Sequence, residues 1–260
     1  MNPATQVPHG TATMTRGMVL LFAFCCGAIV ANIYYAQPII GLIAPDIGLT
    51  NTMASLIVSL TQIGYALGLF FLVPLGDLLE NRRLMIITTL VAIASLLGAA
   101  FTDQPNLFLL ISLLVGFSSV SVQILIPLAA HLAPEETRGR VVGGIMGGLL
   151  LGILLARPVS SVVADHFGWR AMFVIAAVLM AAISIVLAVT IPKREPDHSA
   201  SYGQLLGSLW TLLRKQPVLR QRAFYQGCMF ATFSLFWTAV PLELARNHGL
   251  SQSEIAIFAL

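Results

Sequence analysis

Long apolar stretches alternate with short polar gaps along this chain, and nearly all of its ionizable residues lie in the gaps. A bilayer core about 30 Å thick needs about 20 apolar residues per helix, so each stretch is long enough to cross a membrane. The pattern predicts seven membrane-spanning helices and therefore an all-α polytopic membrane protein. Their expected bounds are Met18–Ala44, Met53–Gly76, Leu84–Phe101, Leu107–Ala130, Val141–Val163, Ala171–Ile191 and Ala223–Leu244.

An eighth apolar stretch begins near Ser253 and reaches Leu260, the last residue. Eight residues of helix rise only about 12 Å, which is too short to cross a bilayer. We therefore expect this chain to be the N-terminal portion of a longer protein, with seven complete spans and the start of an eighth.

Polar residues within the predicted spans follow a pattern that repeats after three helices. The first and second spans carry amide and phenol side chains, the third is almost purely apolar, the fourth and fifth are polar again, and the sixth is apolar. Polar groups at membrane depth must face protein or a water-filled cavity, so the four polar spans are predicted to line one. Two groups of three helices run in opposite directions, which predicts the inverted three-helix repeats typical of secondary transporters.

The longest gap, Pro192–Gln221, divides the chain. Its leucines recur at helical spacing from Leu205 to Leu213, which predicts an amphipathic helix on the membrane surface; an ordinary soluble linker helix is the alternative. We expect a six-helix transmembrane bundle over residues 1–191, a cytoplasmic linker over 192–220, and an incomplete second bundle over 221–260.

Charge adds an orientation to this picture. The chain is 57% hydrophobic and 10% charged, and 11 of its 14 Lys and Arg residues fall in gaps on the side of the N-terminus. Because cytoplasmic loops carry the excess of basic residues, we expect a cytoplasmic N-terminus and a place in the inner membrane of a bacterium. Attraction to the anionic inner leaflet accounts for the net charge of +3, so no nucleic-acid partner is expected. The eleven residues are Arg16, Arg82, Arg83, Arg138, Arg140, Lys193, Arg194, Arg214, Lys215, Arg220 and Arg222.

The gap after the second span holds a charged motif with Asp77, Arg82 and Arg83. Asp77 follows the C-terminus of a predicted helix, where the helix dipole disfavours an anion, so it needs a cationic partner or another helix N-terminus. The run from Val73 to Arg83 resembles the major facilitator signature Gly-x-Leu-x-Asp-Arg-x-Gly-Arg-Arg. Its matching residues are Leu75, Asp77, Arg82 and Arg83, and those that depart from it are Val73, Leu78, Glu80 and Asn81. The resemblance implies that these residues latch onto the other half of a transporter and steady one conformation. A solvated loop that only sets the topology is the alternative.

Small residues recur every four positions along the fifth span, and this spacing lets two helices approach closely. They are Gly144, Gly148, Gly152, Ala156 and Ser160. The series resembles the helix-5 motif Gly-x-x-x-Gly-Pro-x-x-Gly-Gly of the drug and sugar:proton antiporter (efflux) branch of the major facilitator superfamily, with Ala156-Arg157 in place of Gly-Pro. The resemblance implies a sliding interface between two transporter halves, to which Gly148, Gly152, Ala156 and Pro158 would belong; static packing is the alternative.

Arg157 is the single basic residue within a predicted span, about 24 Å from its cytoplasmic end. Because a charged side chain at this depth costs about 3 kcal/mol or more, it needs a special environment. Arg157 would either face a cavity, where it could bind an anionic substrate or a carboxylate of the missing half, or reach the outer interface by snorkelling. Pro158 removes a backbone hydrogen bond and is expected to kink the helix beside it.

Four further residues are predicted to line a substrate cavity, because amide and phenol groups can orient a partly polar molecule among apolar walls. These are Asn32, Tyr35, Gln62 and Gln123, with interhelical hydrogen bonding as the alternative. Glu243, near the outer end of the seventh span, is the single carboxylate within a span and the candidate for proton coupling. The three cysteines show no metal-ligand spacing, and neither a metal nor a cofactor is expected.

These features predict a secondary active transporter that exports a small molecule by alternating access. Proton coupling is what the resemblance to the antiporter branch implies. A truncated fragment that needs a partner chain before it can transport, or an importer of a small organic solute, are the alternatives. An enzyme would need a nucleophile, a metal cluster or paired carboxylates, and the sequence offers none of these arrangements. The expected partners are the lipid bilayer, the substrate, protons and the missing second half.

Overall fold

The computed structural model describes residues 15–191, 201–251, 254, 255 and 258, and these residues form helices joined by short connections. A 3₁₀ helix, η1 (Val73–Asp77), ends the second span. The α-helices are α1 (Arg16–Ala31), α2 (Ala36–Asp46), α3 (Asn51–Ala54), α4 (Leu56–Phe71), α5 (Asn81–Phe101), α6 (Pro105–Ser118), α7 (Val122–Leu132), α8 (Arg138–Phe167), α9 (Trp169–Thr190), α10 (Tyr202–Lys215) and α11 (Pro217–Asn247).

Seven helical segments among the described residues are long and apolar enough to cross a membrane, as the sequence predicts. The first span comprises α1 and α2, and the fourth comprises α6 and α7. Most of them extend a few residues beyond their predicted ends, because a helix continues into the interface where polar residues such as Arg138 and Asn247 are tolerated. The last span begins at Pro217, six residues before its predicted start, because a proline at the first helical position is compatible with helix geometry.

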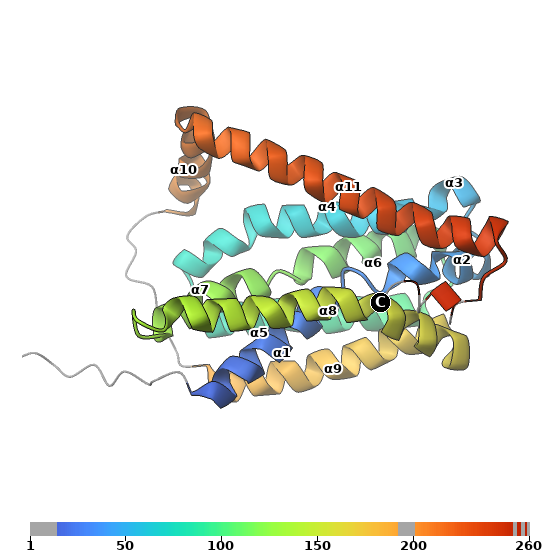
Figure 1. The fold of residues 1–260 in the computed structure, drawn as a ribbon, viewed down its shortest axis with the longest axis horizontal. Helices are drawn as coiled ribbons and strands as arrows, with labels where there is room; N and C mark the ends of the chain where they lie inside the picture. The colour runs from blue at the N-terminus through green and yellow to red at the C-terminus, as the bar shows by residue number, and fades with distance from the viewer. Residues whose placement is uncertain (1–14, 192–200, 252–253, 256–257, 259–260) are drawn as a thin grey trace, which may run out of the picture.

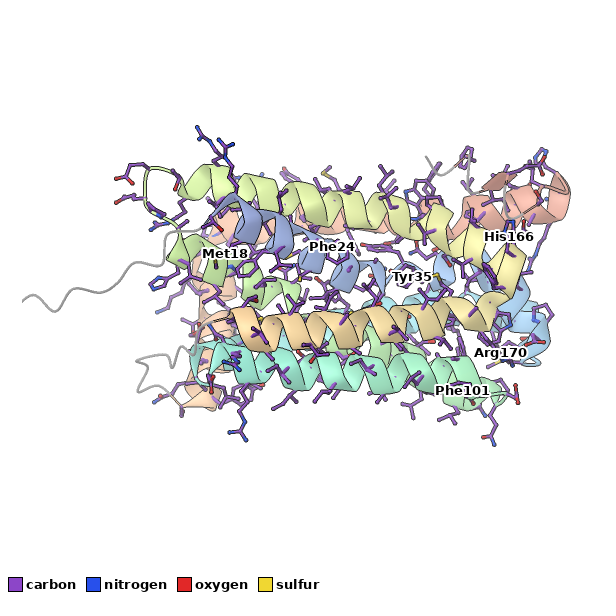
Figure 2. All side chains as sticks on the ribbon, turned by 90° about the horizontal axis from the view of Figure 1, so that it is seen from below. Met18, Phe24, Tyr35, Phe101, His166 and Arg170 are labelled. Atoms are coloured by element: carbon purple, nitrogen blue, oxygen red, sulfur yellow. The ribbon has the colours of Figure 1, made fainter. Side chains whose placement is uncertain are left out.

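The spans run side by side between two ends (Figure 1). Met18 lies at one end, and Phe101, His166 and Arg170 lie at the other, with Tyr35 between them (Figure 2). We refer to these as the Met18 end and the Arg170 end. At the Arg170 end, Gly168 has a φ of +82° and a ψ of 156°, a conformation that favours glycine, and it separates α8 from α9.

Three helix pairs dominate the packing: α1 with α8, α4 with α6, and α5 with α9. In terms of spans, these are the first with the fifth, the second with the fourth, and the third with the sixth. If the first, second and third spans are exchanged with the fourth, fifth and sixth, the pair of the first and fifth spans becomes the pair of the fourth and second. The pair of the third and sixth spans stays the same. This is the pairing that two inverted three-helix repeats require, and it confirms the six-helix bundle.

Glycines allow the closest of these contacts. A Cβ atom on Gly27 of α1 would lie 2.6 Å from the carbonyl oxygen of Gly148 on α8. A Cβ atom on Gly64 of α4 would likewise meet the backbone of Leu113 on α6. Both pairs therefore need glycine, because the helix backbones themselves are in contact.

Helices α10 and α11 lie outside the six-helix bundle. Figure 1 shows α11 running along one side of it, and α11 contacts the bundle mainly through α2. The predicted amphipathic helix is α10, whose Tyr202 hydroxyl donates a 2.9 Å hydrogen bond to the carbonyl oxygen of Phe71. The charged start of the predicted linker, 192–200, and the predicted first residue of the eighth helix, Ser253, lie outside the described residues.

Candidate functional site

Two spans are interrupted at membrane depth, and both are the first helix of a repeat. The first span is broken at residues 32–35, where the amides of Ile33 and Tyr34 donate to carbonyls three residues earlier. The fourth span is broken at residues 119–121, where Ser119 likewise bonds to Gly116. Such tightened turns often mark functional hinges, and interruptions at corresponding positions of two repeats point to a binding site in transporters.

Arg157 lies beside the first interruption and is only 2% exposed. Its Nε donates a 3.2 Å hydrogen bond to Oε1 of Gln37, and its Nη1 donates a 3.1 Å bond to the carbonyl oxygen of Ile153. Its Nη2 is buried without a hydrogen-bond partner. The sequence left two placements open for Arg157, inside the protein or at the outer membrane interface. In the structure the guanidinium group lies inside the protein.

Three aromatic rings surround the guanidinium group of Arg157. Its Cζ lies 4.9 Å from the ring centroid of Tyr34, 5.1 Å from that of Phe233 and 4.3 Å from that of Trp237. Each ring can contribute a cation–π attraction of about 0.5–2 kcal/mol, more where water is excluded. We call Tyr34, Phe233 and Trp237 the aromatic cage. Because Phe233 and Trp237 belong to α11, the cage joins the six-helix bundle to the next span.

Several polar groups around this interruption have no partner. Nε2 of Gln37, both side-chain polar atoms of Asn32 and Oγ of Ser161 are buried and make no hydrogen bond. Ser160 differs, since its Oγ donates a 2.6 Å bond to the carbonyl oxygen of Tyr35. Among the described residues, no carboxylate lies within ion-pair distance of Arg157. Unpaired buried polar groups are uncommon because each costs about 1–3 kcal/mol, so this concentration makes the surroundings of Arg157 the candidate site.

A second polar cluster lies between α4 and α7. Nε2 of Gln123 donates a 3.2 Å hydrogen bond to the hydroxyl of Tyr65, and Nε2 of Gln62, one turn earlier on α4, is buried without a partner. Of the five predicted cavity residues, Gln62 and Gln123 thus belong to this second cluster, Asn32 and Arg157 lie at the first interruption, and Tyr35 contributes the carbonyl oxygen that Ser160 contacts.

The predicted gating residues lie elsewhere. Asp77 is exposed at the end of η1, Arg82 is half-buried and Arg83 is exposed, and within the described ranges none of the three makes an ion pair. The latch between transporter halves stays a prediction for all three.

The small residues of α8 pack on α1. Gly148 faces Ala23, Gly152 faces Gly27, and Ala156 and Pro158 are buried. Gly148 and Gly152 thus pack within the six-helix bundle, and the sliding interface between halves, to which all four residues were assigned, stays a prediction. Helix α8 continues through Pro158 to Phe167.

Glu243 lies apart from the polar clusters. It is exposed near the end of α11, and its Oε1 accepts a 2.7 Å hydrogen bond from Nδ2 of Asn247. The structure thus does not bring the candidate coupling residue to Arg157, and its role in proton coupling stays a prediction.

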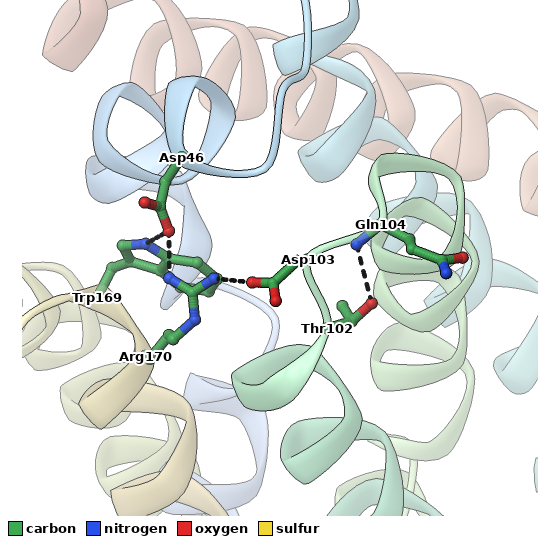
Figure 3. A network of polar contacts seen from close by, with 6 residues as sticks. All are labelled: Asp46, Thr102, Asp103, Gln104, Trp169 and Arg170. Atoms are coloured by element: carbon green, nitrogen blue, oxygen red, sulfur yellow. Dashed lines mark hydrogen bonds and ion pairs between the residues drawn. The ribbon is translucent and has the colours of Figure 1, made fainter.

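An ion-pair network closes the Arg170 end of the bundle (Figure 3). Arg170 bridges Asp46 at the end of α2 and Asp103 in the connection between α5 and α6. Nε1 of Trp169 donates a 3.1 Å hydrogen bond to the same carboxylate of Asp46. We call Asp46, Asp103, Trp169 and Arg170 the Arg170 network. It ties the end of α2 and the start of α9 to the connection between α5 and α6.

Sequence reasoning missed four residues of the Arg157 site. Tyr34 and Gln37 were visible as polar residues of the first span but were not selected, because spacing alone does not tell which of several polar residues faces a given neighbour. Phe233 and Trp237 were missed altogether. The available signal was their spacing of four residues, which places two aromatic rings on the same face of one helix.

Comparisons with known proteins agree with this architecture. The family model described as Major Facilitator Superfamily matches residues 19–260. The chain is 42% identical over 233 residues to the "Uncharacterized transporter YgaY" of Escherichia coli O157:H7. The aligned region covers 89% of this chain and 59% of that protein. It is 35% identical over 254 residues to the "Probable transporter SCO4007" of Streptomyces coelicolor, covering 98% of this chain and 59% of that protein. The chain thus spans about three fifths of the length of these relatives.

Solved structures share the fold. A crystal structure of a D-xylose–proton symporter superimposes with a TM-score of 0.67 at 16% identity, over 93% of this chain and 64% of that chain. The inward-open xylose transporter XylE from E. coli gives a TM-score of 0.64 at 15% identity, over 94% of this chain and 65% of that chain. At such low identity, the likeness concerns the fold alone.

Proposed function

This chain belongs to the major facilitator superfamily of membrane transporters, and on that premise we propose that it takes part in exporting a small organic molecule by alternating access, coupled to protons. The observation that carries the proposal is the buried, incompletely paired polar centre around Arg157, next to an interrupted span. Burying a polar centre of this kind at membrane depth costs free energy, and the binding of a solute would offset that cost.

The direction of transport and the antiporter branch rest on the helix-5 series from Gly144 to Ser160. The helix-5 series resembles that of the efflux branch, whereas the motif around Asp77 resembles the signature of the whole superfamily and supports the transporter family alone. The xylose transporters support the fold and add nothing on direction, because their identity to this chain is too low. The excess of basic residues at the Met18 end supports a cytoplasmic position for that end, in a bacterial inner membrane.

We further propose that the six-helix bundle works with a second transporter half, of which α11 is the first helix. Apolar side chains of α11 such as Phe224, Met229 and Leu235 are largely exposed, so α11 offers a surface for further helices. The greater length of the relatives supports the same view. The second half would lie either in the same polypeptide or in a partner chain.

Transport in everted membrane vesicles tests this function. In such vesicles respiration acidifies the lumen, so a proton-coupled exporter accumulates its substrate inside. A labelled panel of organic anions, sugars and cationic drugs would be offered to vesicles with and without the protein. We expect one class to accumulate only with the protein and only until a protonophore is added. If no compound accumulates above the control, the export function is refuted, and uptake into right-side-out vesicles instead would identify an importer.

A further inference from the structure

The Arg157 site holds a buried positive charge without a negative partner among the described residues. Arg157 is 2% exposed, and the residue in hydrogen-bond contact with its Nε is Gln37, which is neutral. A glutamate would fit in the same volume and would neutralise the charge. Because the amide leaves the charge in place, an isolated buried cation is maintained at membrane depth, which costs several kcal/mol.

The free hydrogen-bonding groups at this site are chiefly donors. Nη2 of Arg157 and Nε2 of Gln37 are both unpaired, and they belong to side chains that are already in contact through Nε and Oε1. Guanidinium and ammonium-type N–H groups carry no lone pair to accept with, and an amide nitrogen only donates. The complementary ligand is therefore a group that only accepts hydrogen bonds, and an ionised carboxylate has this property.

The aromatic cage and two hydrogen bonds limit which atoms of the Arg157 guanidinium group such a ligand can contact. The three rings lie within 5.1 Å of the guanidinium carbon, Nε is taken by Gln37 and Nη1 by Ile153. The edge of the guanidinium group that carries Nη2 remains for a ligand to contact. The three rings of the cage lie close to the same guanidinium group, and aromatic surfaces favour a ligand with a flat, apolar body.

We propose that the Arg157 site binds the carboxylate of a small organic monoanion, with one oxygen accepting from Nη2 of Arg157 and the other from Nε2 of Gln37. The site offers one uncompensated charge, so a single carboxylate neutralises it. This assignment of a substrate class rests on the proposed transport function, and it adds that the transported molecule is an acid with an apolar, preferably aromatic, body.

Equilibrium binding tests the assignment without any need for transport. The probe is radiolabelled benzoate, and the competitor is benzamide, which has nearly the same shape but no charge. The full-length protein in lipid nanodiscs should bind benzoate saturably, and benzamide should compete poorly. Arg157→Gln should weaken benzoate binding about 30-fold or more, because it removes the charged partner of a buried carboxylate.

Gln37→Glu is the sharper variant, since it keeps the size of the side chain and places a carboxylate against Nε of Arg157. We expect this variant to lose benzoate binding while it melts at or above the temperature of the wild type, so a folding defect cannot explain the loss. Arg140→Gln is the matched control, because Arg140 is an exposed arginine of the same helix, outside the site, and its removal should leave binding unchanged.

Equal benzoate affinity in the wild type and in Gln37→Glu would overturn the proposal, as would benzamide competing as well as benzoate or a wild type without saturable binding. The transport assay separates this result from the proposed function. Accumulation of a neutral compound in vesicles, together with no benzoate binding, would refute the carboxylate site and leave the transporter. Charge-dependent benzoate binding without transport of any compound would support the site and refute export.

Discussion

Two adjacent glycines of α8 give a matched test of how the bundle is held together. Gly148 lies against α1, and a Cβ atom there would lie 2.6 Å from the Cβ of Ala23, well inside ordinary van der Waals contact. Gly147 is the next residue, and a Cβ atom there would meet nothing within 4 Å. Both are interior positions of one long helix, so Gly→Ala changes their helix propensity equally.

The expected magnitudes follow from this geometry. Alanine is favoured over glycine by about 0.8–1.0 kcal/mol in a helix interior, so Gly147→Ala should stabilise the protein by up to about that amount. Gly148→Ala gains the same propensity, but it forces α1 and α8 apart by about 1 Å to restore ordinary carbon–carbon contact, and overpacking costs about 1–3 kcal/mol. The propensity gain cancels when the two variants are compared, so Gly148→Ala should be about 1–3 kcal/mol less stable than Gly147→Ala.

Thermal unfolding of the purified protein in one detergent, followed by intrinsic fluorescence, would rank the two variants against the wild type. Reversible unfolding in mixed detergent would supply the free-energy difference. If Gly148→Ala proved as stable as Gly147→Ala, the backbone contact between α1 and α8 would not exist as described, and the packing role given to Gly148 and Gly152 would have to be abandoned.

Three other variants test other parts of the molecule. Asp77→Asn should reduce transport while insertion into the membrane, measured by protease accessibility, stays normal; unchanged transport would remove the latch assigned to this residue. Gly168→Ala should lower stability by about 1–3 kcal/mol, since its φ of +82° suits only glycine, and a melting temperature equal to that of the wild type would contradict this conformation. Arg170→Gln should cost at most about 1 kcal/mol, because its ion pairs are exposed, and the loss should shrink in high salt. A loss that is independent of salt would show that the Arg170 network acts through packing and not through charge.

The membrane spans could be predicted from the sequence because hydrophobic length is a local property. The seven spans among the described residues, their order and the polar character of four of them follow from residues that each span carries by itself. The predicted ends were short by a few residues at places such as Arg138, where a hydropathy pattern stops but the backbone hydrogen bonds continue. The helix at Pro217 began early because proline is compatible with the first position of a helix, which a hydropathy pattern does not register.

The interruptions at residues 32–35 and 119–121 were not predictable from local signals. Neither stretch contains glycine or proline, the residues that usually mark a break in a helix. Both lie next to packed neighbours that offer other hydrogen-bond partners, such as Thr88, whose Oγ1 lies 2.6 Å from Oγ of Ser121. The breaks are therefore properties of the assembled bundle.

The candidate site could be predicted in part. Arg157 stood out because a charge within an apolar span is expensive, and its partner Gln37 was visible but could not be distinguished from Gln62 or Gln123. The contacts of Phe233 and Trp237 with Arg157 join residues almost 80 positions apart, and no pattern within one helix reveals such a contact.

The aromatic cage is assembled from two sides, and this has an energetic consequence for movement. Tyr34 belongs to the six-helix bundle, whereas Phe233 and Trp237 belong to α11, which contacts the bundle mainly through α2. Any displacement of α11 away from α2 strips the guanidinium of two of its three rings, a loss of about 1–4 kcal/mol. These contacts therefore favour the position of α11 seen in the structure. If a carboxylate binds Arg157 as proposed above, its binding would shift the balance between this position of α11 and any other, because the same guanidinium contacts both.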